Sequence, residues 1–144
     1  MSAVEEPDPS STAMILARSF AVLEADHPAA FHRFTRALAG LTIHVEVGAE
    51  RFTLTVRNGA PAIRPEWSDE ARPATVQTDR SGILALIDGS KSLFESVSGR
   101  ELRVTADPDT LVRLSQGLTC FAEGAVRSPR MRALLAELRG CARS

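Results

Sequence analysis

Residues 43–63 read IHVEVGAERFTLTVRNGAPAI, and apolar residues recur at every second position in two parts of this stretch. The two parts are Ile43–Val47 and Phe52–Val56, and a period of two is typical of β-strands with one buried face. The pair Asn58-Gly59 supplies the positive backbone angles of a tight hairpin, which returns the chain along residues 60–64. This stretch therefore predicts three antiparallel strands in sequence order.

The strand pattern returns later in the chain, between helical segments. Residues 74–78 and 102–105 alternate in the same way and predict a fourth and a fifth strand. Apolar residues at spacings of three and four predict helices elsewhere, with Ser81 and Asp107 as N-caps of two of them. The expected helices begin near Ala13, Pro28, Ser81, Leu93, Pro108 and Met131. We expect an α+β fold in which a five-stranded, mostly antiparallel sheet is covered on one face by helices.

The chain of 144 residues has the size of one domain. Residues 1–12 are acidic and lack apolar periodicity, which predicts a disordered tail, and residues 140–144 are predicted to be a mobile C-terminus. Residues 13–139 then form a single domain. Because we find neither a signal peptide nor an apolar run of about 20 residues, we expect a cytoplasmic protein. Cys120 and Cys141 are expected to be free thiols.

The charged residues exclude one class of partner and suggest another. A formal net charge of −1 gives no electrostatic reason to bind nucleic acid. Sixteen of the seventeen basic residues are Arg, a bias that we attribute to GC-rich codon usage, so we expect a bacterial origin. The C-terminal arginines are candidates for contact with an anionic membrane or an acidic partner, and the alternative is a solvated helix face. They are Arg127, Arg130, Arg132, Arg139 and Arg143.

The sequence lacks the usual catalytic and metal-binding patterns. The histidines, His27, His32 and His44, are isolated, and the two cysteines lie in different expected helices, so we predict no metal site. There is no Gly-x-Ser-x-Gly elbow and no glycine-rich phosphate loop, so neither a nucleophilic triad nor a cofactor is expected. His44 and Glu46 are predicted to share an exposed face of the sheet. Trp67 is expected to cover either the mouth of a cavity or the edge of the core.

Three segments in this order resemble the sterol carrier protein type two family: Ile43–Ile63, Ala74–Gly89 and Gly99–Asp107, the last followed by Leu111–Leu114. The resemblance covers residues 28–121. In that family, a strand that ends in Thr or Ser precedes a short helix with paired leucines and a closing glycine. The matching residues here are Thr78, Leu84, Leu86 and Gly89.

A second family block contains a glycine, a basic residue, a leucine, another basic residue and an aliphatic residue. The matching residues are Gly99, Arg100, Leu102, Arg103 and Val104. This sequence departs from the family pattern at two places. Glu101 is an extra residue within the block, and Ala106 stands where the family usually has glycine.

The resemblance implies an apolar tunnel between the sheet and the helices. It also implies non-catalytic binding or transfer of a lipid-like molecule, such as a sterol, a fatty acyl chain or an acyl-CoA. Burial of apolar surface at about 25 cal/mol per Å² would drive this binding, and no catalytic residue is required. We predict a lining of residues that should point from a strand or helix into the shared interior. They are Val45, Phe52, Leu54, Leu84, Phe94, Leu111, Leu114, Leu118 and Phe121.

Two other functions remain open. The domain could be solidly packed and serve as an accessory module that binds a partner protein. It could also be a small cyclase or isomerase of an apolar metabolite, with His44 or Glu66 as the group that transfers a proton. The N-terminal helix and the helix of residues 131–138 lie outside the resemblance, and we expect them to cover the tunnel or to form a homodimer contact.

Overall fold

The computed structural model describes residues 11–69 and 73–142, and their side chains as far as residue 140. In this part of the chain, six helices and five strands follow one another in the predicted order. The helices are α1 (Thr12–Asp26), α2 (Pro28–Ala37), α3 (Arg80–Ile87), α4 (Leu93–Ser98), α5 (Pro108–Ala125) and α6 (Pro129–Ala142). The strands are β1 (Thr42–Val47), β2 (Glu50–Arg57), β3 (Ala60–Pro65), β4 (Ala74–Thr78) and β5 (Arg103–Thr105).

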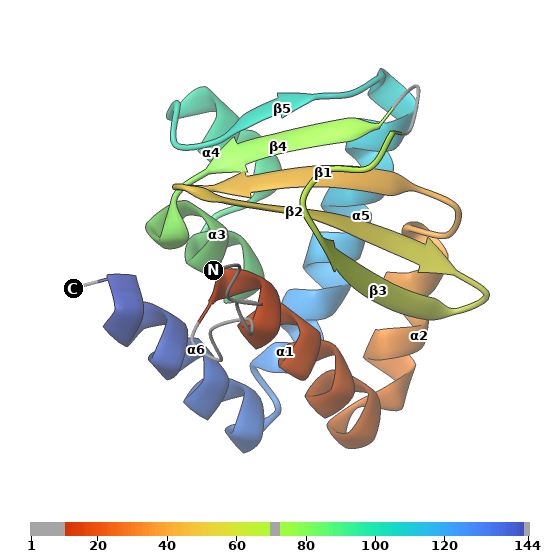
Figure 1. Cartoon of the computed structure of the whole chain (residues 1–144). Helices are drawn as coiled ribbons and strands as arrows, with labels where there is room; N and C mark the ends of the chain where they lie inside the picture. The colour runs from red at the N-terminus through yellow and green to blue at the C-terminus, as the bar shows by residue number, and fades with distance from the viewer. Residues whose placement is uncertain (1–10, 70–72, 143–144) are drawn as a thin grey trace, which may run out of the picture.

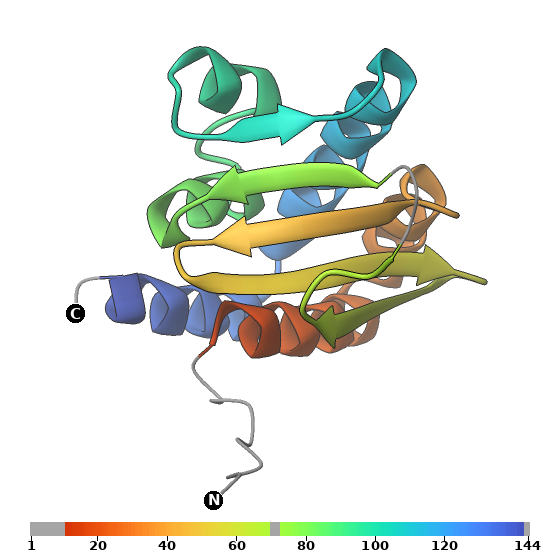
Figure 2. The same cartoon turned by 45° about the horizontal axis from the view of Figure 1, so that its top comes forward.

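The five strands form one sheet in the order β3-β2-β1-β4-β5. β1, β2 and β3 are the predicted antiparallel meander, and β4 pairs with β5 in the antiparallel sense. β4 lies parallel to β1, with Val45 opposite Val76, so the sheet is mixed and mostly antiparallel. The helices pack on one side of this sheet, as Figures 1 and 2 show from two directions. The predicted α+β fold is therefore confirmed.

Local capping interactions determine where the helices begin. Asp107 accepts a hydrogen bond from the Thr110 backbone N–H and caps α5 as predicted. The predicted cap of α3 is wrong by two residues, because the Asp79 carboxylate accepts the bond from the Gly82 N–H. α1 begins at Thr12, inside the segment predicted as a tail, because the Ser11 side chain caps this helix. Residues 1–10 of that predicted tail lie outside the described residues.

Helix α5 lies at the centre of the helical layer and approaches α1 and α2 closely. A Cβ atom at Gly124 would lie 2.4 Å from Leu23 Cδ1 and 2.8 Å from Ala30 Cβ. At Gly117, a Cβ would lie 3.0 Å from Leu38. Only glycine permits this separation between the helices, because van der Waals contact requires at least about 3.5 Å between carbon atoms.

Helix α6 is attached to the end of α1 by polar contacts and to the core by apolar ones. The Asp26 carboxylate accepts hydrogen bonds from the Ser128 hydroxyl at 2.6 Å and from the Arg130 guanidinium. Met131 and Leu138 are fully buried. α6 lies outside the residues that resemble the sterol carrier family. These contacts explain why the chain forms an additional helix there. Its predicted roles as a cover or a dimer contact stay predictions.

We expect Asp26→Asn to lower the free energy of unfolding at neutral pH, because it weakens the attachment of α6. The same substitution should have a smaller effect at acidic pH. Hydrogen bonds from Arg130 and Ser128 hold the pKa of the Asp26 carboxyl below its ordinary value of 3.8. A carboxylate with a lowered pKa stabilises the fold above its unfolded pKa, and this contribution disappears as pH falls through the folded pKa. Urea unfolding of the unmodified protein and of the Asp26→Asn variant, at pH 7 and at about pH 3, measures the loss in free energy of unfolding at each pH. The exposed Glu24→Gln on the same helix is the control, and an equal Asp26→Asn effect at both pH values contradicts the prediction.

Candidate functional site

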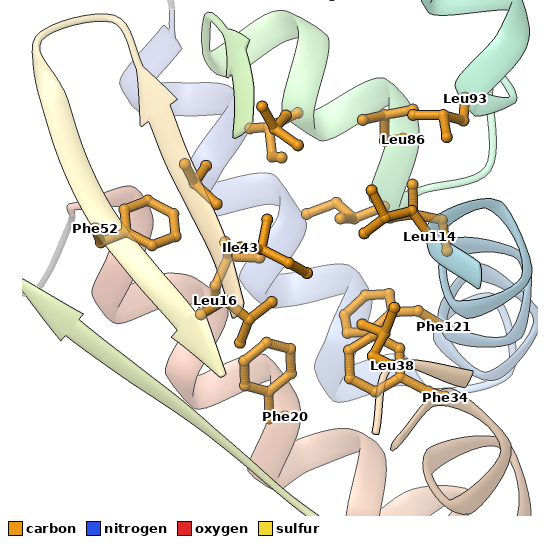
Figure 3. Close-up of a pocket in the computed structure, with 16 residues that line it drawn as sticks. Leu16, Phe20, Phe34, Leu38, Ile43, Phe52, Leu86, Leu93, Leu114 and Phe121 are labelled. Carbon is orange, nitrogen blue, oxygen red and sulfur yellow. The ribbon is translucent and has the colours of Figure 1, made fainter. Parts of the chain in front are cut away.

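An apolar cavity of ≈ 80 Å³ lies between the sheet and the helical layer. Figure 3 shows side chains from the strands and from the helices pointing toward this shared space. All sixteen lining residues are apolar, so the interactions that they offer a ligand are dispersion and burial rather than hydrogen bonding. They are Leu16, Phe20, Phe34, Leu38, Ile43, Val45, Phe52, Leu54, Val76, Ile83, Leu86, Ile87, Leu93, Leu114, Leu118 and Phe121.

The strand residues that line the cavity follow from the alternation seen in the sequence. Ile43 and Val45 of β1 point to the same face as Leu54 and Phe52, their partners across the antiparallel pair. Val76 of β4 stands beside Val45 in the parallel register. This part of the lining therefore comes from three adjacent strands.

The structure brings six of the nine predicted lining residues to the cavity. They are Val45, Phe52, Leu54, Leu114, Leu118 and Phe121. Leu84 is buried and Leu111 is half-buried, but neither lines the cavity. The Phe94 side chain is 55% exposed, so its predicted inward orientation is wrong. Successive residues of a helix point about 100° apart, and on α4 the buried apolar residue is Leu93.

Sequence reasoning missed the contribution of α1 and α2. Leu16, Phe20, Phe34 and Leu38 line the cavity from these two helices. Their helical periodicity marked them as buried, but periodicity gives no information about which buried residues border a cavity. Phe20, Phe34 and Phe121 also contact one another, with ring centroids 5.4–6.2 Å apart. These three rings fill one region of the interior.

The predicted tunnel is not present among the described residues. The cavity of ≈ 80 Å³ is smaller than the roughly 300–1,000 Å³ of typical small-molecule sites. Core side chains such as the three packed phenylalanines occupy much of the space between the layers. A lipid-sized ligand would therefore have to displace side chains or separate the helices from the sheet.

The opposite face of the sheet carries a cluster built on Trp67. This side chain stacks on His44 with ring centroids 5.1 Å apart, and the Arg51 guanidinium lies 4.6 Å from its ring centroid. The Trp67 indole N–H donates to the Val45 carbonyl at 3.0 Å, and His44 Nε2 lies 3.0 Å from Ser68 Oγ. His44 is only 6% exposed, so the prediction of an exposed His44 is wrong. Trp67 covers the outer face of the sheet and not a cavity mouth.

We expect Trp67→Ala to lower the free energy of unfolding by about 2–3 kcal/mol, since it removes a hydrogen bond, a cation–π contact and the stacking on His44. Lipid affinity should not change, because the cluster lies on the face of the sheet opposite the cavity. Chemical denaturation and a lipid-binding titration of the same variant measure both quantities. Trp67→Phe keeps an aromatic ring and should lose less stability. A large loss of lipid affinity in either variant would contradict this placement.

Other predicted surface and polar residues have local structural partners. Arg130 pairs with Asp26, and the Arg139 guanidinium lies 3.9 Å from the Asp88 carboxylate. His27 Nδ1 accepts a hydrogen bond from the Ala30 N–H and caps α2. Within residues 11–69 and 73–142, no group of three or more His, Cys, Asp or Glu residues could hold a metal ion. None of the described helices has the length and apolar character that crossing a bilayer requires.

The chain has the fold of sterol carrier protein 2 domains, which are its structural neighbours over most of its length. One is the UbiJ-SCP2 ubiquinone synthesis protein, with a TM-score of 0.61 and 19% identity over 85% of this chain and 98% of that one. Another is the sterol carrier protein domain 2 of Helicoverpa armigera, with a TM-score of 0.60 and 11% identity over 85% of this chain and 96% of that one.

Three further findings limit this likeness. The sec-alkylsulfatase Pisa1 from Pseudomonas sp. matches with a TM-score of 0.51 and 16% identity, over 60% of this chain. The match covers 14% of the sulfatase, so the fold occurs there as a small part of an enzyme. Neither a model of a protein family nor a curated protein sequence matches this chain. At these identities the comparisons establish the fold.

Proposed function

We propose that this protein binds or transfers a lipid-like apolar small molecule between its sheet and its helices, without catalysing a reaction. The observation that carries the proposal is the cavity, whose sixteen lining residues are all apolar and come from both layers of the fold. The structural neighbours include proteins described as sterol carriers, which supports the same function here. The neighbour described as a ubiquinone synthesis protein supports a role in binding an apolar compound that other proteins synthesise or modify.

The cavity of ≈ 80 Å³ must expand for such a ligand. The helical layer contacts the sheet through apolar side chains, and this contact is non-directional, so the layers can separate without breaking backbone hydrogen bonds of the sheet. Each additional methylene group that the ligand buries contributes about 0.8 kcal/mol. An acyl chain of eight to ten carbons could therefore offset the cost of rearranging several core side chains.

Native mass spectrometry of the purified protein, followed by denaturing extraction, tests the proposal. We expect an apolar molecule to copurify, or a ligand-free protein to bind the neutral fluorescent probe N-phenyl-1-naphthylamine with displacement by medium-chain lipids. A protein that carries no lipid and binds neither the probe nor fatty acids or sterols would contradict the proposal.

A second candidate function is that of a packed accessory module. The small cavity favours it, and so does the occurrence of this fold as a small part of the alkylsulfatase. In that case the core stays closed and the surface binds a partner protein. The same binding experiment separates the two functions, because a packed module takes up no probe.

A further inference from the structure

Two surface grooves approach the apolar cavity from different sides. One, of ≈ 250 Å³, lies between α5 and the segment that connects α3 to α4. The other, of ≈ 270 Å³, lies between α1 and the β2–β3 hairpin. Leu86, Leu93 and Leu118 line both the cavity and the first groove, whereas the second groove shares Phe20 with the cavity. A side chain that lines both spaces lies between them. The first groove is therefore separated from the cavity by the side chains of these three leucines.

The wall next to α5 includes the short helix α4. Leu93 is the first residue of α4, which has six residues and packs mainly against α3 and α5 among the described helices. Phe94 and Val97 on the same helix are exposed. Figure 1 shows α4 at the edge of the molecule, beside the edge strand β5. Segments with few buried contacts open locally at low free-energy cost, so α4 can move without disrupting the sheet.

The rim of this groove is polar and carries hydroxyl groups. Ser92, Ser115 and Thr119 line it together with the carboxylates Glu95 and Glu123. The same groove is lined by these polar groups and, on the side that it shares with the apolar cavity, by leucines. Such a gradient from polar to apolar matches an amphipathic lipid whose chain enters the cavity and whose head stays in the groove.

The charges of the rim disfavour an anionic head group. The single basic residue among the residues that line the groove, Lys91, pairs with Glu101. Glu123 lies 3.7 Å from the Arg33 guanidinium. Hydrogen bonds from the backbone and hydroxyl of Ser92 lower the pKa of the Glu95 carboxyl, so this group is ionised at neutral pH. With these ion-pair partners included, three carboxylates stand against two basic groups, so the rim presents a net negative charge beside hydroxyl groups.

We infer that the groove between α5 and the α3–α4 connection is the mouth of the cavity and the head-group site, and that it selects lipids with an uncharged hydroxyl or carbonyl head over lipids with an anionic head. This inference rests on the proposed carrier function. The cavity then selects the length and shape of the lipid chain, and the carboxylates of Glu95 and Glu123 disfavour a negatively charged head group.

Stopped-flow binding of N-phenyl-1-naphthylamine tests the position of the mouth. Ser115→Trp places a large side chain in the groove without changing a cavity residue, and it should slow both association and dissociation by at least about tenfold. Ala17→Trp in the other groove is the matched control and should leave both rates unchanged. If Ser115→Trp fails to fold by circular dichroism, Thr119→Trp in the same groove replaces it. Slow binding in Ala17→Trp with normal rates in the groove variant would overturn the assignment.

Displacement of the same probe by 1-decanol and by decanoate tests the head-group selection. In the double variant Glu95→Gln, Glu123→Gln, the preference for decanol over decanoate should fall roughly threefold to tenfold, as expected for removal of two nearby charges in water. The glutamine introduced by Glu95→Gln retains an amide oxygen that can accept the Ser92 hydrogen bond, so the helix cap is preserved. Glu24→Gln, at the rim of the other groove, should not change the preference.

The outcomes separate this inference from the proposed function. An unchanged preference in the double variant would overturn the head-group selection, while the protein would still be a lipid carrier. Binding of decanoate as tight as that of decanol by the unmodified protein would also overturn it, because the groove would then not disfavour an anionic head group. If the unmodified protein binds neither the probe nor any of these lipids, the carrier function itself fails and the inference fails with it.

Discussion

Replacing Phe121 with alanine is expected to lower the free energy of unfolding by about 3–5 kcal/mol, the cost of removing a buried phenylalanine from a packed core. Phe121 is 1% exposed, and its ring makes edge contacts with those of Phe20 and Phe34. It also lines the cavity, so the truncation enlarges a space that is already present instead of letting the core collapse around the gap. Because domains are stable by only about 5–15 kcal/mol, this one change would remove a large share of the stability of the protein.

Thermal and urea unfolding of Phe121→Ala measure this loss. Phe94→Ala is a matched control with the same chemical change at a side chain that is 55% exposed, and it should cost less than about 1 kcal/mol. Similar losses in the two variants would contradict the packing described here. In that case the interior would have to be loosely packed around the three phenylalanines.

Leu114→Trp is expected to reduce lipid affinity by at least about tenfold, because the larger side chain fills the cavity that a ligand must enter. Leu114 is buried in the middle of the lining, on the face of α5 that points toward the sheet. Overpacking of this kind also costs about 1–3 kcal/mol of stability, which a domain of ordinary stability tolerates. Titration with N-phenyl-1-naphthylamine gives the affinity, and circular dichroism reports whether the variant is folded.

Val112→Trp is the control for this experiment. Val112 lies two residues earlier on the same helix and is 49% exposed, so a tryptophan there meets solvent. Its lipid affinity should equal that of the unmodified protein. Normal affinity in a folded Leu114→Trp variant would show that ligands bind elsewhere, and the proposed lining would be wrong.

Much of the fold could be predicted because it depends on interactions that are local in sequence. The alternation in residues 43–63 predicted the three-stranded meander, and Asn58-Gly59 predicted its second turn. Asp107 and Pro108 predicted the start of α5. The order of motifs also placed the chain beside the sterol carrier protein fold, and the structural neighbours confirm this resemblance. The strand alternation, the turn and the helix start are each encoded by residues close together in the chain.

The lining of the candidate site was predicted only in part. Strand residues such as Val45 and Phe52 were identified because alternation decides which face of a sheet a side chain occupies. The helices were harder to interpret. The apolar face of a helix is wide enough to contact several neighbouring helices and strands, so burial alone does not identify the residues that line the cavity. Leu84, for example, is buried but does not line it.

By itself, the sequence determined the elements of this protein, their boundaries to within a few residues, and which face of each strand is apolar. Tertiary structure alone decided that β4 lies parallel to β1, that Trp67 buries His44, and that the space between the layers is small. The physical reason is the range of the interactions. Period, caps and turns depend on residues close together in the chain, whereas a cavity depends on how distant side chains share one volume.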